Sequence, residues 1–165
     1  MKSRVKKQED ENMMIPYGKQ DISQADIDMV TEVLKSDFLT QGPMINRFEM
    51  LVAEKCNVEY ATAVNSATAA LHIACLALGV GEGDIVWTSP ITFVASANCA
   101  LYCGATVDFV DIDPKTYNLS PARLEEKLVI AEKNGKLPKV VIPVHLAGQP
   151  CEMDKIKQLS QKYGF

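Results

Sequence analysis

The 165-residue sequence lacks any long hydrophobic run. No stretch approaches the roughly 20 apolar residues that a membrane-spanning helix requires, and the N-terminus lacks the apolar core of a signal peptide. We therefore expect a cytoplasmic protein. The 17 basic and 21 acidic residues are mixed along the chain, with a formal net charge of -4. No charged region favours nucleic acid or anionic lipid, so small molecules are the expected partners.

Cysteine pairs with the spacing of a zinc site or a redox motif are also missing. The five cysteines include no C-x-x-C pair and mostly stand among apolar residues, so we expect buried free thiols. Cys99 and Cys103 are one helical turn apart, but no His or further Cys stands near enough to complete a set of metal ligands. We therefore predict no metal site.

Two common phosphate-binding motifs are absent as well. The sequence contains no G-x-x-x-x-G-K-[ST] motif and no glycine fingerprint of a dinucleotide-binding fold. These absences argue against ATP hydrolysis and against NAD binding.

The composition is that of a soluble globular domain, with 47% apolar and 23% charged residues. Residues 1–12 carry one apolar residue after the initial methionine and are expected to form a disordered tail. Residues 13–59 read as an N-terminal helical segment. Ser23 and Asp26 predict a capping box at the start of one helix, which carries an apolar stripe (Ile27, Val30 and Leu34) and ends near Ser36. A second helix should close near Cys56 and Asn57.

From Tyr60 onward, short apolar strands alternate with helices. The predicted strands are 61–64, 85–88, 107–112 and 140–145, and the predicted helices are 67–78, 93–102, 121–133 and 153–163. Continuously apolar strands indicate a mostly parallel sheet with helices on both faces, an α/β doubly wound layout. The sequence stops at Tyr163-Gly164-Phe165, which is typical of a helix end followed by a further strand. We therefore interpret residues 60–165 as the first part of a truncated domain.

A candidate anion site lies where the strand 61–64 turns into a helix. Ser66, Ala67 and Thr68 are small, and the first turn of a helix offers unpaired N–H groups and the positive end of the helix dipole. A phosphate would fit there. The residues alone leave open the alternative that Ser66 only caps the helix.

Phe93 follows the next strand, at the carboxyl edge where ligands of open α/β sheets bind. Its ring could stack on a flat cofactor, or it could be the first core residue of the following helix, which is the commoner role of an aromatic residue.

Other polar residues have ordinary structural interpretations. His72 and His145 invite a catalytic interpretation, but His72 lies on a helix that is apolar all round, where a hydrogen-bonded structural histidine is expected. His145 ends a strand near the site, where it is either structural or in contact with a ligand. Asp108, Asp111 and Asp113 alternate along one strand and its exit, a spacing that is weak support for acid-base chemistry.

Several strings in the sequence resemble one known family: F-L-T-Q-G-P, N-S-A-T-A-A-L-H, S-P-I-T-F-V-A-S-A-N, G-A-T-V-D-F-V-D-I-D and I-P-V-H-L-A-G-Q-P. In this order, from about Ile15 to Phe165, they are similar to the DegT/DnrJ/EryC1/StrS family of pyridoxal 5'-phosphate (PLP) dependent nucleotide-sugar aminotransferases. The resemblance implies the large domain of a fold-type I PLP-dependent transferase, like that of aspartate aminotransferase. It is strongest to the branch that aminates a UDP-4-keto-6-deoxy-N-acetylhexosamine in pseudaminic acid biosynthesis.

The resemblance also implies roles for individual residues. Cofactor contacts fall on Ser66, Ala67, Thr68 and Phe93, with the backbone amides of Ala67 and Thr68 and the threonine hydroxyl holding the phosphate. Substrate contacts fall on Tyr17, Asp37, Phe38, Leu39, Thr40 and Ser66. The Schiff-base lysine and the aspartate that pairs with the pyridinium nitrogen would lie beyond Phe165, so no catalytic residue is assigned here.

The implied full-length enzyme moves an amino group, from glutamate, to the C4 ketone of a UDP-linked sugar, and it works as a homodimer. Residues 1–165 alone are expected to be inactive. One alternative is a PLP-dependent deoxysugar dehydratase of the same fold, in which a histidine replaces the Schiff-base lysine. Another is a non-catalytic ligand-binding or regulatory module. Residues beyond Phe165 decide between these alternatives.

Overall fold

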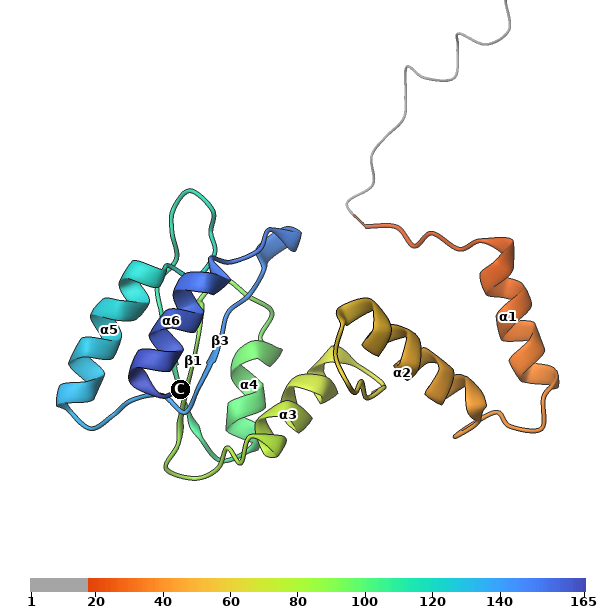
Figure 1. Ribbon diagram of the computed structural model, residues 1–165, viewed down its shortest axis with the longest axis horizontal. Helices are drawn as coiled ribbons and strands as arrows, with labels where there is room; N and C mark the ends of the chain where they lie inside the picture. The colour runs from red at the N-terminus through yellow and green to blue at the C-terminus, as the bar shows by residue number, and fades with distance from the viewer. Residues whose placement is uncertain (1–17) are drawn as a thin grey trace, which may run out of the picture. The chain divides into compact units, whose positions relative to one another are not determined.

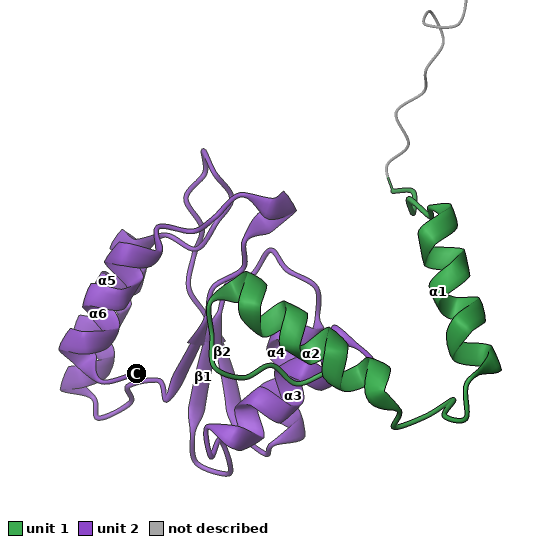
Figure 2. Ribbon diagram, turned by 45° about the vertical axis from the view of Figure 1, so that its right-hand side comes forward, with its two compact units in different colours: residues 1–63 green, residues 64–165 purple. Residues whose placement is uncertain are grey.

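The computed structural model describes residues 18–165 and divides the chain into two compact units (Figure 2). The first unit is Met1–Ala63 and the second is Val64–Phe165. The predicted tail of residues 1–12 lies outside the described residues. Each unit is treated by itself below.

The described part of the first unit, residues 18–63, contains two helices, α1 (Gln24–Lys35) and α2 (Pro43–Cys56). The capping box forms as predicted, because the Asp26 amide donates to Ser23 Oγ at 3.4 Å and the Ser23 amide donates to Asp26 Oδ2 at 2.7 Å. The hydrogen bonds from Ser23 lower the pKa of Asp26. Helix α2 starts at a proline and ends at Asn57, whose left-handed backbone (φ 51°) turns the chain away. The predicted helix ends are confirmed.

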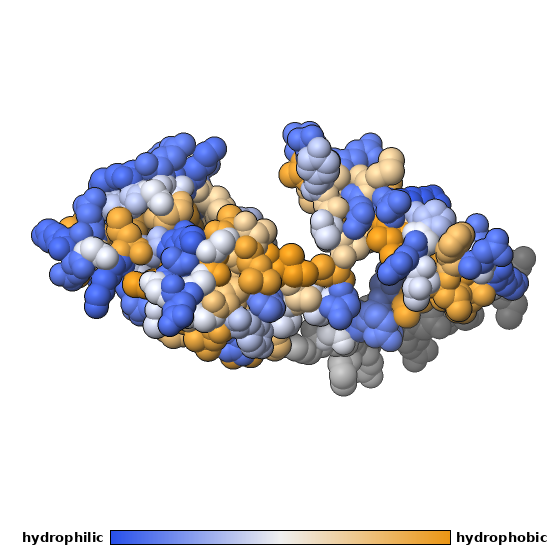
Figure 3. Space-filling view, turned by 90° about the horizontal axis from the view of Figure 1, so that it is seen from below, coloured by the Kyte–Doolittle hydropathy of each residue, from blue (hydrophilic) through white to orange (hydrophobic). Residues whose placement is uncertain are grey.

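Neither helix of the first unit contains a buried residue. The predicted apolar stripe on α1 is present but open to solvent, with Ile27, Val30 and Leu34 exposed by 49%, 59% and 66%. On α2, Phe48 and Met50 are likewise exposed. Figure 3 shows apolar side chains on the surface of the molecule. These helices therefore gain little stability from contacts within their own unit.

The second unit is built on a parallel sheet of three strands in the order β2-β1-β3 (Figure 1). Strand β1 (Ile85–Thr88) lies in the middle and pairs with β2 (Thr106–Phe109) and β3 (Val140–Ile142). The predicted order of strands and helices from Ile85 onward is confirmed, although β2 and β3 end earlier than predicted. Beyond β2 the chain turns at Asp111, and Ile112 forms an antiparallel bridge with Leu119 instead. Beyond β3, Pro143 has no N–H to donate.

The strand predicted at residues 61–64 does not form. The amide of Ala63 donates to the carboxylate of Glu49 on α2 at 2.8 Å, so this N–H is used by the helix rather than by a neighbouring strand. The two alanines in this stretch also have little tendency to form strands.

Two pairs of helices cover the sheet, one pair on each face. Helices α3 (Ala67–Ala77) and α4 (Ala95–Tyr102) pack against each other, and Cys75, Cys99 and Ala100 meet Val86 in one core cluster. The other face carries α5 (Pro121–Lys133) and α6 (Met153–Tyr163), whose buried residues surround Trp87. Because Val86 and Trp87 are consecutive, β1 sends its side chains alternately into the two cores. The predicted layout, helices on both faces of a parallel sheet, is confirmed.

Helix ends in the second unit largely follow the predicted signals. The hydroxyl of Ser120 accepts from the Arg123 amide ahead of Pro121, and Gly164 adopts a left-handed conformation (φ 78°) after α6. Helix α4 begins at Ala95, two residues later than predicted, because Thr92 and Phe93 belong to the loop after β1. Among the described residues, no helix has the length and apolar character needed to cross a bilayer.

The five cysteines are free thiols in different environments. Cys75, Cys99 and Cys151 are buried and Cys103 is half-buried, as predicted. The prediction is wrong for Cys56, which is exposed because it lies in the last turn of the unpacked helix α2. Burial, together with the neighbouring thiol of Cys99, raises the pKa of Cys75 to about 11. No metal-binding cluster occurs among residues 18–165.

Candidate functional site

The direction in which α3 runs relative to the sheet tells at which edge its N-terminus lies. At its C-terminal end, the carbonyl of Gly79 accepts a hydrogen bond from Lys139 Nζ at 2.5 Å, and the same ammonium pairs with Asp84 at 2.8 Å. Lys139 and Asp84 immediately precede β3 and β1, so this end of α3 lies at the amino edge of the sheet. The N-terminus of α3 therefore points to the carboxyl edge, where ligands of parallel sheets bind.

The N-terminus of α3 has the form of an anion cradle. Ser66 is the N-cap, and its hydroxyl accepts from the Ala69 amide at 3.2 Å. Within the described residues, the amides of Ala67 and Thr68 make no hydrogen bond to protein. Ser66 and Ala67 are exposed and Thr68 is half-buried, and none of the three has a bulky side chain to block the approach of a ligand. Two free N–H groups, a hydroxyl and the positive helix end together fit a phosphate.

Phe93 lies in the loop between β1 and α4, at the same carboxyl edge. Helix α4 also ends at the amino edge, where Gly104 lies beside the backbone of Glu82. Phe93 is 73% exposed, so the alternative that it is the first core residue of the helix is wrong. Its loop is anchored nearby, because the hydroxyls of Thr92 and Ser96 are hydrogen-bonded at 2.8 Å. The structure thus presents an unburied aromatic ring at the carboxyl edge, toward which the N-terminus of α3 also points.

The residues predicted to contact substrate are divided between the units. The loop Asp37–Thr40 connects α1 and α2, and the Ser36 hydroxyl fixes it by donating to the Phe38 carbonyl at 3.1 Å. Phe38 and Leu39 are exposed. Ser66 belongs to the second unit, and Tyr17 lies outside the described residues. The structure therefore describes this loop without placing it against the cradle.

The two histidines have different surroundings. His72 is half-buried on α3 and meets Tyr102 edge to face, with ring centroids 5.3 Å apart. His145 is exposed at the exit of β3, and its Nδ1 accepts a hydrogen bond from the Cys151 amide at 3.1 Å. Both contacts agree with a structural role.

The three aspartates around β2 have structural partners. Asp108 pairs with Lys127 Nζ at 2.6 Å, and although burial acts to raise its pKa, the hydrogen bond from Lys127 leaves the pKa lowered. Asp113 Oδ1 accepts from the Lys115 amide at 2.7 Å and so shapes the turn after β2. The structural interpretation of these carboxylates is the better one.

One residue at the carboxyl edge escaped the sequence analysis. Asn118 is buried, with 4% exposure, and its side chain bridges two loops. Its Oδ1 accepts from the Leu146 amide at 3.0 Å and its Nδ2 donates to the Gln149 carbonyl at 2.9 Å. The partners lie about 30 positions away, and no local pattern marks such a bond.

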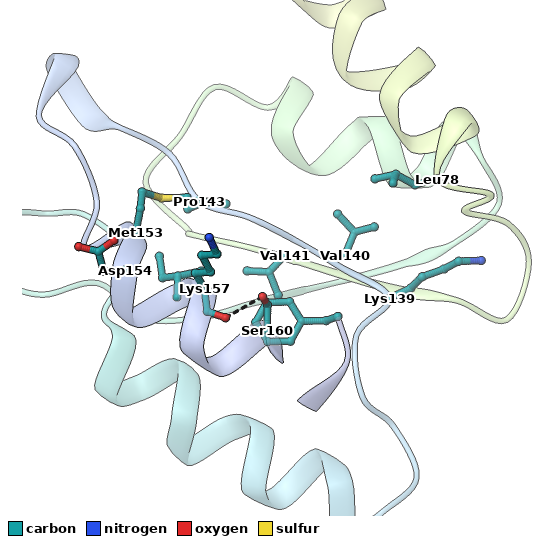
Figure 4. A pocket seen from close by; sticks show the side chains of 11 residues that line it. Leu78, Lys139, Val140, Val141, Pro143, Met153, Asp154, Lys157 and Ser160 are labelled. Atoms are coloured by element: carbon teal, nitrogen blue, oxygen red, sulfur yellow. Dashed lines mark hydrogen bonds between the residues drawn. The ribbon is translucent and has the colours of Figure 1, made fainter. Parts of the chain in front are cut away.

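An apolar groove of about 510 Å³ runs between β3 and α6 (Figure 4). Val140, Val141 and Pro143 form one wall, and Met153 and Ile156 form the other. The charged end of Lys139 points away from the groove, toward Asp84. Within residues 18–165, β3 pairs only with β1, so the groove follows the side of this strand that has no neighbouring strand there. It lies apart from the α3 cradle and offers few polar groups to orient a small ligand.

Comparison with known proteins places the chain among the aminotransferases, the class to which its structural neighbours belong. Residues 20–165 match the model of the DegT/DnrJ/EryC1/StrS aminotransferase family, and the chain belongs to this family. Among its relatives, the UDP-4-amino-4,6-dideoxy-N-acetyl-beta-L-altrosamine transaminase of Campylobacter jejuni serotype O:2 is 44% identical over 152 residues, which is 92% of this chain and 39% of that protein.

Solved structures confirm the predicted fold-type I architecture. Helicobacter pylori PseC, an aminotransferase of pseudaminic acid biosynthesis, superposes with a TM-score of 0.82 at 32% identity, over 91% of this chain and 39% of that one. Spr1654 from Streptococcus pneumoniae in its PLP form superposes with a TM-score of 0.79 at 33% identity, over 90% and 36%. The chain spans less than two fifths of the length of the curated relatives that it matches.

Proposed function

We propose that this chain supplies the phosphate-binding and ring-binding part of a PLP-dependent nucleotide-sugar aminotransferase. The observation that carries the proposal is the N-terminus of α3 toward the carboxyl edge of the sheet, where the amides of Ala67 and Thr68 make no hydrogen bond to any of residues 18–165. Membership of the aminotransferase family supports the same reading of the site.

Each residue of the site has a part in binding. The amides of Ala67 and Thr68 and the Thr68 hydroxyl donate hydrogen bonds to the phosphate, and the dipole of α3 adds favourable electrostatics. Phe93 packs its exposed ring against the pyridine ring. Ser66 holds the helix start and borders the sugar. When bound, PLP supplies the electron sink that amino transfer requires.

The proposed reaction takes an amino group from glutamate and delivers it to the C4 ketone of a UDP-4-keto-6-deoxy-N-acetylhexosamine. Support comes from the similarity to the C. jejuni transaminase and to PseC. The loop Asp37–Thr40 and Tyr17 are the proposed sugar-binding segments. The intact enzyme is proposed to be a cytoplasmic homodimer, and the exposed apolar residues of α1 and α2 support further packing partners for these helices.

No lysine of this chain is proposed as the catalytic base. Lys139 is held at the amino edge of the sheet, opposite the cradle. Lys127 and Lys162 are paired with Asp108 and Glu125 on the face covered by α5 and α6. These three lysines are held away from the cradle, and the Schiff-base lysine is proposed to lie outside this chain.

The test places a negative charge in the cradle. Ala67→Glu puts a carboxylate among the phosphate-binding amides and should weaken PLP binding, measured by isothermal titration calorimetry, at least about tenfold. Ala122→Glu is the matched control, since Ala122 is an exposed residue in the first turn of α5, on the other face of the sheet. A carboxylate stabilises the first turn of either helix. Equal PLP affinity in the two variants would reject the proposal.

A further inference from the structure

His145 follows β3 at the carboxyl edge of the sheet, the edge toward which the N-terminus of α3 points. Leu71 and Cys75 of α3 belong to the same core cluster as Val140 and Ile142 of β3, so these strand side chains point to the face of the sheet that α3 and α4 cover. Their amino-edge ends are tied together, because the ammonium of Lys139 donates to the carbonyl of Gly79.

From the Lys139–Gly79 contact, α3 back to its start and the chain forward to His145 have about the same length. From Gly79 back to Ser66, a helix rise of 1.5 Å per residue gives about 20 Å. From Lys139 forward to His145, an extended chain at 3.3 Å per residue also gives about 20 Å. His145 and the N-terminus of α3 therefore both lie toward the carboxyl edge of the sheet.

The imidazole of His145 is held in one tautomer. The amide of Cys151 can only donate, so Nδ1 must accept its hydrogen bond at 3.1 Å. The neutral ring then carries its proton on Nε2. Within residues 18–165, Nε2 makes no hydrogen bond to protein, and the side chain is exposed. The ring therefore offers one oriented N–H donor at the ligand edge.

The turn that carries the ring is fixed from both sides. Asn118, itself 96% buried, binds the Leu146 amide and the Gln149 carbonyl with its two amide atoms. The thiol of Cys151 donates to the Val144 carbonyl at 3.2 Å. Ala147 is held in a left-handed conformation (φ 52°) inside this turn. Such a turn keeps the direction of the Nε2–H bond constant.

We propose that His145 is a further ligand-binding residue, whose Nε2–H donates to an anionic oxygen of the ligand at the carboxyl edge. This inference rests on the proposed function, which places a phosphate at the N-terminus of α3, toward the same edge of the sheet. Both the phosphate of PLP and the diphosphate of a nucleotide sugar carry such oxygens. The Nε2–H group of His145 can therefore donate a hydrogen bond to either the cofactor or the substrate.

A pair of substitutions separates binding from the structural role of the ring. In His145→Asn, the side-chain oxygen can replace Nδ1 as acceptor for the Cys151 amide, while the distal donor is lost. In His145→Gln, an N–H group remains near the position of Nε2, while the Nδ1 acceptor is lost. We expect His145→Asn to keep its Tm and to lose about tenfold in affinity for PLP or for UDP-N-acetylglucosamine. His145→Gln should lower the Tm and keep more of the affinity. Unchanged affinity of His145→Asn for both probes would overturn the proposal.

Ring nitrogen NMR gives a readout that does not depend on stability. The chain has only two histidines, so a His72→Gln variant assigns the two imidazoles. We expect the Nε2–H tautomer for His145 and a shift of its Nε2 resonance with one of the two probes, whichever supplies the anionic oxygen. An Nδ1–H tautomer, or no shift with either probe while the Thr68 amide responds to PLP, would overturn the role of His145 alone. If neither Thr68 nor His145 responds, the proposed function fails and the inference fails with it.

Discussion

Lys139 and Asp84 form an ion pair at the amino edge of the sheet, with Lys139 Nζ 2.8 Å from Asp84 Oδ2. The same carboxylate accepts from the Gly81 amide at 2.9 Å, and the same ammonium donates to the Gly79 carbonyl. The pair thus joins the start of β1, the start of β3 and the end of α3. It holds α3 at the end opposite the proposed phosphate site.

Asp84→Asn should lower the Tm relative to the unchanged protein at pH 7, and this difference in Tm should disappear in acid. The hydrogen bond from Lys139, followed by that from Gly81, lowers the pKa of Asp84 in the folded protein. Its stabilising contribution is therefore fully present above the unfolded pKa of about 3.9 and is lost as the pH falls through the lower folded value. Thermal melts of both proteins from pH 7 to pH 2.5 should converge at the acid end. Glu126→Gln, which breaks an exposed pair with Arg123, is the control and should change the Tm little at any pH.

Leu128→Ala should lower the free energy of unfolding by about 3 kcal/mol, because Leu128 is completely buried between α5 and the sheet. Urea denaturation followed through the single tryptophan, Trp87, measures the change within the same core. Val129→Ala, one residue along the helix at 37% exposure, should cost much less. Similar losses in the two variants would contradict the described packing of α5.

Phe93→Ala should leave stability nearly unchanged, within about 0.5 kcal/mol, because the side chain is 73% exposed. PLP affinity should fall about threefold to tenfold through loss of the stacking contact. Calorimetric titration with PLP, together with a thermal melt, gives both quantities. Tyr117→Ala, at another exposed aromatic residue, is the control. A large drop in the Tm of Phe93→Ala would mean that the ring belongs to the core after all.

Borohydride treatment of the chain with PLP should attach no cofactor to a specific lysine. The reason is that Lys139, Lys127 and Lys162 are held in ion pairs away from the cradle. Peptide mapping by mass spectrometry tests this, with the non-specific labelling of exposed lysines by pyridoxal as the background. Stoichiometric labelling of one lysine within residues 18–165 would show that the chain does contain a reactive base.

Cys56 should react with a thiol reagent such as dithionitrobenzoate in the folded protein at pH 8, well before the buried cysteines. Cys75, with a pKa raised to about 11, stays a protonated thiol at that pH, and burial also raises the pKa of Cys151. Cys75, Cys99 and Cys151 should react only after unfolding in urea. A Cys56→Ser variant should lose the fast phase. Rapid reaction of Cys75 in the folded state would contradict the packing of α3 on α4.

Features that depend on neighbouring residues were predictable from the sequence. The capping box at Ser23, the Ser120-Pro121 helix start and the Gly164 helix end each rest on hydrogen bonds or backbone angles within a few positions. Helix lengths and the assignment of β1 therefore follow from the residues alone. The small residues at Ser66 to Thr68 likewise marked a helix start that could bind an anion.

Features that depend on distant partners were not predictable. Strand formation needs a neighbour, and the stretch that was expected to pair from residue 61 gives the Ala63 amide to Glu49 instead. The exposure of Phe93 is set by where α4 begins, two residues later than the pattern suggested. Asn118 finds its partners about 30 positions further along the chain. The structure shows that Ser66 does cap α3, and the direction of the helix, which places its start toward the carboxyl edge, depends on the distant contact of Lys139 with Gly79.

The parallel direction of α3 and α4 has an electrostatic consequence. Both helices end at the amino edge, so their two N-termini lie at the carboxyl edge together and their dipoles add. A chain of net charge -4 thereby obtains a locally positive potential from its backbone. Peptide dipoles do not titrate, so this attraction for anions should stay constant across the pH range in which the fold is intact.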